Sequence, residues 1–228
     1  MSDRRSGGVA EFFGERAAGY ESEAIRGIPR RDEMFGALMD ALPADANDIL
    51  ELGCGPGALT ARLVERYPRA SVTAVDAAAE MLDVARERLG PAGERVRFVA
   101  STFEQFDAGT QDFDLVTGSM SLHHVVEKEG YYRRLHASLR PGGFLIFADE
   151  LVGAVPHIEK HHRQGWFDFA SAPGHLTEAE IADCLDHEAR FDHFETLPDQ
   201  LDALRAAGFA SVDCAWRYLN YAVFAAAV

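Results

Sequence analysis

The sequence predicts an α/β fold built on a doubly wound, mostly parallel sheet. Three observations support this prediction. Short apolar segments suited to strands alternate along the chain with stretches in which apolar residues recur at helical spacing. Residues 48–52 end in a glycine-rich turn that leads directly into such a helical stretch. Residues 144–148 are continuously apolar, as expected for a strand that helices cover on both faces.

The turn after the first predicted strand contains Gly53, Gly55 and Gly57 in alternate positions. Glycine tolerates positive φ and lets a ligand approach the backbone where a Cβ would collide. The helix predicted from Ala58 presents unpaired N–H groups to the same place. This segment therefore predicts a site for a nucleotide-like ligand. Gly53, Gly55 and Ala58 also satisfy a dinucleotide fingerprint with Asp76 as its ribose acid, so an NAD site stays open at this point.

The remaining elements follow in chain order from periodicity and turn signals. We expect a loose tail over residues 1–8 and two helices within residues 9–46, separated near Gly27. Further strands are predicted over residues 70–75, 95–99, 113–120, 144–148, 211–216 and 219–226. Further helices are predicted over residues 77–85, 131–139 and 196–207. Residues 151–194 are expected to hold two more, of which the second begins with a capping-box pattern at Thr177 and Glu180.

Length and composition indicate one domain, residues 1–228, with a sizeable core. The net charge is −15, from 22 Lys and Arg against 37 Asp and Glu, which disfavours a nucleic-acid substrate. Cys54, Cys184 and Cys214 are scattered, so we expect reduced intracellular thiols. The chain shows no signal-peptide core and no window of about eighteen apolar residues. We therefore expect a cytoplasmic protein without a membrane partner.

Several motifs resemble those of class I S-adenosylmethionine (SAM) methyltransferases. The segment beginning Glu51-Leu-Gly-Cys-Gly-Pro-Gly is similar to the family's first motif, an acid followed by x-Gly-x-Gly-x-Gly. Further likenesses lie in Phe113-Asp-Leu-Val, in Leu122-His-His-Val, in Leu139-Arg-Pro-Gly-Gly and in the segment from Leu204 to the C-terminal strands. The resemblance implies a seven-stranded sheet whose last strand is antiparallel. It also implies that residues 151–194 are a helical lid inserted after strand five.

The same resemblance implies SAM as the cofactor. Asp76, at the end of the second predicted strand, is expected to accept both ribose hydroxyls. Ser101 stands where many relatives carry an aspartate, so backbone groups of the next two residues are expected to contact the adenine. The residues expected to bind the cofactor are Tyr20, Glu51, Gly53, Gly55, Gly57, Asp76, Met81, Ser101, Thr102, Phe103, Ser119 and His124.

His124, and after it His123, is the expected catalytic base if the acceptor must lose a proton on methylation. Adjacent positions on a helix point about 100° apart, so we expect no metal ion shared by these two histidines. His157 and His161 are four residues apart, which is compatible with metal binding on a helix, but an exposed amphipathic helix is the simpler interpretation. We therefore expect no metal site.

The lid has no family counterpart, and within it Trp166 and Phe167 are expected to line the acceptor pocket beside His124. The predicted reaction is in-line methyl transfer to a small, partly apolar metabolite, by a monomer or homodimer. Two alternatives stay open. A carboxy-SAM synthase-like enzyme needs an arginine for a substrate carboxylate, for which only Arg163 and Arg217 are candidates. An NAD-binding oxidoreductase fits the glycine turn but not the later motifs.

Overall fold

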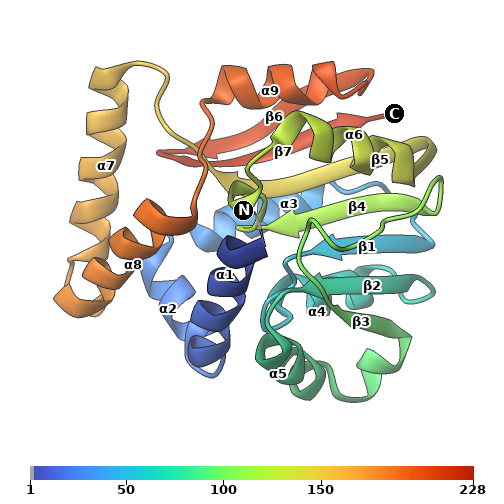
Figure 1. Cartoon of the computed structure of the whole chain (residues 1–228), viewed down its shortest axis with the longest axis horizontal. Coiled ribbons are helices and arrows are strands. Elements are labelled where there is room, and N and C mark those ends of the chain that lie inside the picture. The colour runs from blue at the N-terminus through green and yellow to red at the C-terminus, as the bar shows by residue number, and fades with distance from the viewer. Residues whose placement is uncertain (1–2) are drawn as a thin grey trace.

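A computed structural model describes residues 3–228 of the chain. Its centre is one seven-stranded sheet with the strand order β3-β2-β1-β4-β5-β7-β6 (Figure 1). Every neighbouring pair from β3 to β5 is parallel, whereas β7 is antiparallel to both β5 and β6. Six strands therefore share one direction and β7 alone runs against them, which confirms the predicted doubly wound sheet with an antiparallel last strand.

The strands lie where periodicity predicted them, with small shifts at their ends. Their bounds are β1 Asp48–Leu52, β2 Ser71–Asp76, β3 Val96–Ala100, β4 Phe113–Ser119, β5 Leu139–Glu150, β6 Ser211–Tyr218 and β7 Tyr221–Ala227. The largest difference is in β5, which begins five residues before the expected Phe144. Phe113 pairs with Leu139 and Leu115 with Phe144, so residues 140–143 form an irregular bulge opposite Asp114, and regular pairing resumes at the expected Phe144.

Nine α-helices and two short 3₁₀ helices are present in residues 3–228. They are α1 Asp3–Arg16, α2 Tyr20–Gly27, α3 Arg31–Ala41, α4 Ala58–Arg66, α5 Ala79–Leu89, η1 Gly90–Arg95, η2 Leu122–His124, α6 Lys128–Ser138, α7 Pro156–Ala170, α8 Glu178–Phe191 and α9 Leu197–Ala206. The expected capping box at the start of α8 is present, because Thr177 and Glu180 each accept from the other's backbone N–H.

The sheet is buried on both faces, and alternate residues of β1 show how. Ile49 belongs to an apolar cluster with Met34 of α3 and Leu63 of α4. Leu50 points to the opposite face and belongs to a second cluster with Tyr132 of α6. Since successive strand residues face opposite sides, a continuously apolar strand needs helices on both. The core thus fixes the strand ends at which the functional residues lie.

The N-terminal segment differs from expectation. We expected a loose tail over residues 1–8, of which the first two lie outside the described residues, yet α1 begins at Asp3. The helix is anchored by contact with the lid: a Cβ on Gly8 would lie 3.0 Å from Cε1 of Phe191. Residues 9–46 accordingly hold the rest of α1 together with α2 and α3, rather than the two helices that we expected.

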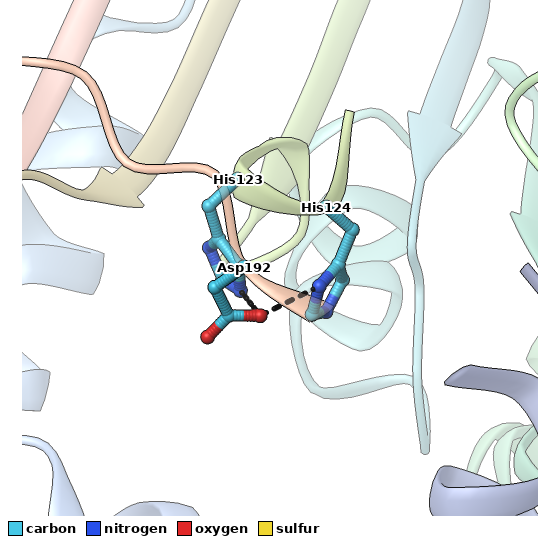
Figure 2. A group of neighbouring side chains, drawn as sticks. All are labelled: His123, His124 and Asp192. Atoms are coloured by element: carbon cyan, nitrogen blue, oxygen red, sulfur yellow. Dashed lines mark ion pairs between the residues drawn. The ribbon is translucent and has the colours of Figure 1, made fainter. Parts of the chain in front are cut away.

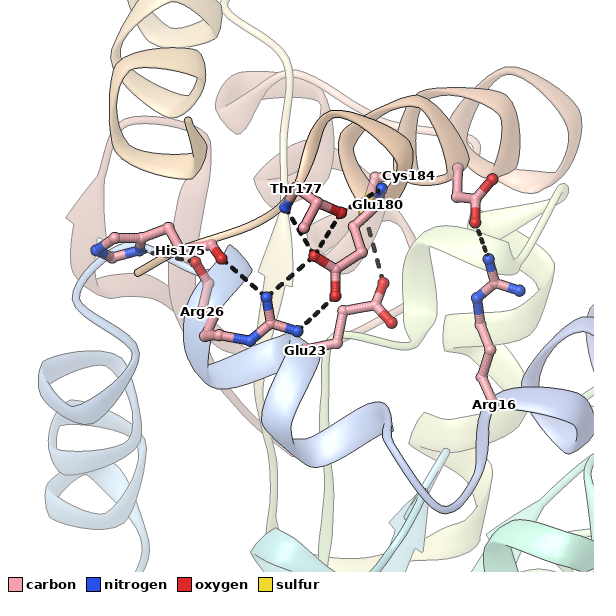
Figure 3. A network of polar contacts seen from close by, with 8 residues as sticks. Arg16, Glu23, Arg26, His175, Thr177, Glu180 and Cys184 are labelled. Atoms are coloured by element: carbon pink, nitrogen blue, oxygen red, sulfur yellow. Dashed lines mark hydrogen bonds and ion pairs between the residues drawn. The ribbon is translucent and has the colours of Figure 1, made fainter. Parts of the chain in front are cut away.

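Four helices gather beyond the carboxyl ends of the parallel strands, at the left of Figure 1: α1, α2, α7 and α8. Polar contacts join the lid helix α8 to the N-terminal helices (Figure 3). Arg26 of α2 donates to both carboxylate oxygens of Glu180, at 2.6 and 3.1 Å, and to the backbone oxygen of His175 at 2.8 Å. Arg16 of α1 pairs with Asp183. The lid is therefore held to α1 and α2 as well as to the sheet.

No helix among residues 3–228 has both the length and the apolar composition needed to span a membrane. The three cysteines are free thiols, and only Cys54 is buried.

Candidate functional site

A cavity lies at the carboxyl ends of the central strands, where open α/β sheets bind their ligands. Strand ends, the glycine turn, α1 and α2 all contribute to its wall. Most of the residues predicted to bind a cofactor line it: Tyr20, Glu51, Gly53, Gly55, Asp76, Met81, Ser101, Thr102, Phe103, Ser119 and His124. The tertiary structure thus brings residues from five separate segments of the chain around one space, which we call the first cavity.

The glycine turn needs its glycines for two different reasons. All three have positive φ: 64° at Gly53, 51° at Gly55 and 80° at Gly57. A Cβ on Gly55 would meet no atom within 4 Å, so the space above that residue is left for a ligand. Gly57 does not line the first cavity. A Cβ there would lie 3.0 Å from Cβ of Ala85, so this glycine allows close packing of α4 on α5 rather than ligand contact.

Asp76 is fixed at the end of β2 by the backbone of the glycine turn. Its Oδ2 accepts from the N–H of Gly55 at 2.8 Å, and its Oδ1 accepts from the N–H of Ala78 at 2.9 Å. Burial raises the pKa of Asp76 above its ordinary value, although these two N–H donors oppose the shift. Each carboxylate oxygen has a second lone pair, so both can still accept a ligand hydroxyl. The acid both braces the turn and faces the cavity.

Glu51 and Arg31 supply an acid and a cation to the first cavity. Glu51 is 1% exposed, its Oε2 has no hydrogen-bond partner among residues 3–228, and burial raises its pKa to about 8. Arg31 donates from Nη2 to both oxygens of Glu21 at 3.1 Å and stacks on Phe35. It is the only Arg or Lys that lines the cavity within the described part of the chain. A zwitterionic group such as an amino acid moiety therefore finds both partners here.

Part of the wall of the first cavity is apolar. Met81 is 1% exposed and packs with Ala78 and Ala17, while the ring of Phe103 contacts Tyr131 at an angle of 49° between the ring planes. The hydroxyl of Ser101 donates to the backbone oxygen of Thr102 at 3.2 Å. Since its donor is already used, the Ser101 side chain has only lone pairs to offer a ligand. These surroundings suit a planar heteroaromatic ring.

His123 is buried and bound to a carboxylate. Its Nδ1 lies 2.6 Å from Oδ1 of Asp149, at the end of β5. Burial opposes protonation, but the charge of Asp149 outweighs it and raises the pKa of His123 to about 9. His123 lines a different cavity from the first. A histidine already protonated near neutral pH cannot accept a proton, so the structure favours His124 over His123 as a base.

His124 lines the first cavity, and its Nδ1 lies 2.9 Å from Oδ1 of Asp192 (Figure 2). Burial and the neighbouring charge of His123 lower the pKa of His124 to about 4, although Asp192 opposes the shift. Burial acts to raise the pKa of Asp192, but contacts with His124 and His187 lower it well below its ordinary range. At neutral pH His124 is therefore uncharged beside a carboxylate, the state that a base requires.

A second cavity adjoins the first on the lid side, and Phe13, Tyr20, Ala24, Ile28 and Met120 line both. Trp166 lines this second cavity and donates from Nε1 to the backbone oxygen of Gly27 at 3.1 Å. Phe167 is 37% exposed and lines neither cavity. The two rings stay in edge-to-face contact, with centroids 5.3 Å apart, but only Trp166 reaches a cavity, and it is not the cavity that His124 lines. Successive helix positions diverge by about 100°, so only Trp166 turns inward.

Sequence reasoning missed three residues that the structure places at the site. Arg31 begins α3, Asp149 ends β5 and Asp192 follows α8. Asp149 and its neighbour Glu150 were visible as acids at a strand end, which places them at the ligand-binding edge. Arg31 and Asp192 carry no such signal, because each lies in a segment whose position depends on packing.

The chain is similar to known methyltransferases. A family model described as "Methyltransferase domain" matches residues 49–143. A trans-aconitate 2-methyltransferase of Streptomyces avermitilis is 32% identical, over 83% of this chain and 68% of that protein. A carboxy-S-adenosyl-L-methionine synthase of Nautilia profundicola is 21% identical over 95% of this chain and 93% of that protein. A solved structure of an S-adenosylmethionine-dependent methyltransferase from Mesorhizobium loti superposes with a TM-score of 0.63 at 23% identity, covering 85% of this chain and 96% of that one.

Proposed function

Because this chain belongs to the SAM-dependent methyltransferases, we propose that it transfers the methyl group of SAM to a small, partly apolar metabolite. The first cavity is assigned to the cofactor and the second to the acceptor. The observation that carries the assignment is the convergence of Arg31, Glu51 and Asp76 on one cavity, because each matches a different polar group of SAM.

The lining of the first cavity offers a suitable partner to each part of SAM. In its contact with Glu21, Arg31 uses Nη2, so its other guanidinium nitrogens are placed to bind the methionine carboxylate, whereas both terminal nitrogens of Arg163 pair with Glu188. The unpaired Oε2 of Glu51 is placed to accept from the methionine ammonium. Asp76 is placed to accept the ribose hydroxyls. The apolar walls at Met81 and Phe103 suit the adenine. An oxygen of Glu51 that is buried without a partner is costly, and a bound cation removes that cost.

The second cavity suits the acceptor because it meets the first at shared walls. Tyr20 and Phe13 line both cavities, and their rings lie 5.5 Å apart between centroids. Trp166 gives the second cavity an apolar wall. Its arginines are already paired with acids, Arg163 with Glu188 at 2.7 Å and Arg16 with Asp183. An acceptor with few negative charges therefore fits this cavity better than a polyanion.

Bound SAM would supply an electrophilic methyl group, with its positively charged sulfur as the leaving group in line with the attacking acceptor atom. The chain's own contribution is to align the two molecules and exclude water. The aromatic faces of Tyr20 and Phe13 at the junction attract the positive charge. Where the acceptor must lose a proton, His124 takes it, because that histidine is uncharged at neutral pH and lines the first cavity.

A carboxy-SAM synthase-like reaction is the second candidate, favoured by the similarity to such a synthase over nearly the whole chain. That reaction needs an arginine for a substrate carboxylate. Arg163 lines the second cavity but forms a two-point contact with Glu188, at 2.7 and 3.2 Å. Arg217 is exposed, lies outside both cavities and donates to the backbone oxygen of Leu219. The methyltransferase assignment therefore ranks first.

The test is calorimetric titration of the purified chain with SAM and, separately, with NAD. SAM should bind with one equivalent and NAD should not bind. Arg31→Gln should weaken SAM binding at least about tenfold, because a charge-assisted hydrogen bond to the carboxylate is lost. Arg30→Gln is the matched control, since Arg30 is its exposed neighbour, lies outside both cavities, pairs with Glu33 and stacks on Tyr218. Equal SAM affinity in the Arg31 and Arg30 variants would contradict the assignment.

The two candidate reactions differ in the mass of their products. Incubation of the chain with SAM and a library of small metabolites should give S-adenosylhomocysteine and a product heavier by one methylene. Formation of carboxylated SAM instead would establish the second candidate.

A further inference from the structure

We propose that His123, His124, His187 and Asp192 form a binding site for one divalent transition-metal ion of the zinc type. His123 and His124 belong to η2, directly after β4, while His187 and Asp192 come from the end of the lid helix α8. The ion would join the lid to the sheet. With one ring nitrogen on the ion and the proton on the other, His124 could not also serve as the base, so the metal-bound protein would bind and position the acceptor without that role of His124. The assignment of the two cavities does not depend on the ion.

Three imidazole nitrogens surround one carboxylate oxygen. Oδ1 of Asp192 lies 2.9 Å from Nδ1 of His124, 3.4 Å from Nε2 of His187 and 3.9 Å from Nε2 of His123. Figure 2 shows the nitrogens of His123 and His124 that face this oxygen from two sides. In a tetrahedral zinc site with bonds of 2.0–2.1 Å, neighbouring ligand atoms are separated by about 3.3 Å. His123, His124 and Asp192 each offer one ligand atom, and these atoms all lie within 4.8 Å of one another, so these three residues are the centre of the site. His187 stands beside them, within 3.4 Å of Asp192, as the fourth ligand of the proposal.

The same atoms lack hydrogen-bond partners. Among residues 3–228, no hydrogen bond is formed by Nδ1 of His124, by Oδ1 of Asp192 or by either ring nitrogen of His187. The side chains are only 8–10% exposed, so water does not satisfy them either. Where such atoms lie about 3 Å apart and still form no hydrogen bond, their N–H bonds and lone pairs are not aligned with each other. Their lone pairs are free for a cation, and a bound cation removes the cost of leaving them unpaired.

His123 has the second contact that metal-binding histidines usually show. Its Nδ1 is held at 2.6 Å by Asp149, which fixes the ring and turns Nε2 towards Asp192. A carboxylate on the other nitrogen orients the ligand and strengthens it as a base. His187 is enclosed by Phe12 and Phe13, at centroid distances of 4.3 and 5.1 Å, so the opposite side of the cluster is apolar. A metal centre requires both features.

The donor set selects the class of ion. Three imidazoles and one carboxylate suit Zn²⁺ and its neighbours among the transition metals, whereas Mg²⁺ and Ca²⁺ prefer oxygen ligands. The sequence argument against a shared metal assumed that His123 and His124 diverge on an α-helix. They lie instead in a 3₁₀ turn with ring centroids 4.3 Å apart, and the cation would sit off the turn, against Asp192.

The test is titration of the untagged chain with Zn²⁺ after removal of metal with a chelator, in competition with a coloured chelator. Because metal binding displaces protons from its ligands, the titration is run at about pH 8, where this release costs less than at neutral pH. One equivalent should bind and raise the melting temperature, while Mg²⁺ should do neither. Substitution with Co²⁺ should give visible absorption bands of a tetrahedral site.

Three variants and one control make the assignment specific. Asp192→Asn and His187→Gln should each weaken Zn²⁺ binding at least about tenfold, and Asp149→Asn should weaken it by about 10–100-fold through the orientation of His123. His157→Gln is the matched control, since this histidine is exposed on the other lid helix. If one of the two ligand variants fails to fold, the other still tests the site. Circular dichroism of each metal-free protein checks its fold.

Absence of stoichiometric Zn²⁺ binding by the wild-type chain would overturn the proposal. So would equal binding by the wild type, Asp192→Asn and His187→Gln, or a loss of binding in His157→Gln. SAM titrations of the same samples are independent, because Arg31, Glu51 and Asp76 lie outside the cluster. SAM binding without Zn²⁺ binding would reject the metal site alone, and Zn²⁺ binding without SAM binding would reject the cofactor assignment alone.

Discussion

The two ends of the functional region are built in different ways. At the cofactor end, Asp76 is already bonded to backbone N–H groups of the glycine turn, and the glycines have the φ values that the turn needs. At the lid end, the ring nitrogens of His187 and Oδ1 of Asp192 are buried without hydrogen bonds. The first region is complete in itself, whereas the second has polar groups that need a further partner. We therefore expect substitutions at the cofactor end to change SAM affinity, and substitutions at the lid end to leave SAM affinity nearly unchanged.

The difference follows from where the residues come from. The centre of the cofactor end consists of β1, the glycine turn and the end of β2, which lie within residues 48–76, so the local strand-turn-helix geometry positions them. The lid end depends on α8 docking against η2 and α1, segments that are distant in sequence. Contacts between α8 and the N-terminal helices, such as Arg26 with Glu180, decide how close the lid comes. The predictions below test this separation, beginning with the largest effect.

Asp76→Ala should lower SAM affinity by more than about tenfold, because two charge-assisted hydrogen bonds of about 1.5–3 kcal/mol each are removed. It should also lower the melting temperature, since Asp76 accepts from Gly55 and Ala78 in the turn. Calorimetry and thermal unfolding measure the two effects. Asp83→Ala, at an exposed aspartate paired with Arg86, is the control. Unchanged SAM affinity in a folded Asp76→Ala protein would refute the role of this acid.

Glu51 should make SAM binding depend on pH. Burial raises its pKa to about 8, so in the free protein it is protonated below that pH, and pairing with an ammonium must release the proton. Affinity should therefore rise with pH, by at most about tenfold per unit, and level off near pH 8. Calorimetry from about pH 6 to 7.5 measures the slope while the ligand's own amino group stays charged.

Glu51→Gln serves as the comparison for that slope, because an amide cannot titrate in this range. The slope should disappear in this variant. Without ligand, the folded protein holds a proton that the unfolded chain has lost between the ordinary glutamate pKa and about 8, so wild-type stability should fall as pH rises through this window. In Glu51→Gln this decrease of stability with rising pH should also be absent. Identical pH profiles for both proteins would show that Glu51 does not face the ammonium.

Trp166→Ala should raise the acceptor's Michaelis constant severalfold and leave SAM affinity nearly unchanged, because Trp166 lines only the second cavity. Steady-state kinetics with a substrate identified by the product screen, together with SAM calorimetry, measure the two quantities. Trp166→Phe keeps an aromatic wall and removes only the N–H bond to Gly27, worth about 1 kcal/mol. A parallel loss of SAM affinity and melting temperature in Trp166→Ala would make this residue part of the common core instead.

Ser101→Ala should have the smallest effect, a change in SAM affinity of less than about 1 kcal/mol. The hydroxyl already donates to the backbone oxygen of Thr102, so the adenine contacts are expected from the backbone. SAM calorimetry measures the change, with Ser71→Ala, at an exposed serine of β2, as control. A loss above about 2 kcal/mol would show that the Ser101 side chain binds the adenine directly.

The sequence by itself determined the sheet and most of the cofactor end. Periodicity gave the strands, and the three glycines marked the turn, because a turn with positive φ at three positions leaves few other residues possible. Asp76 and Ser119 were found since the carboxyl ends of parallel strands meet at one edge. Even there, Gly57 was assigned to the ligand although it serves helix packing, a distinction that only the position of Ala85 reveals.

Only the tertiary structure decided the lid end. Helical spacing drew attention to His157 and His161, which are exposed on α7, whereas the histidines that converge are His124 and His187. Arg31 lines the first cavity, and Trp166 lines a different cavity from His124, for the same reason. Each of these positions depends on how separate helices pack against one another. Burial and docking of distant segments place such side chains, and no local spacing in the chain encodes that arrangement.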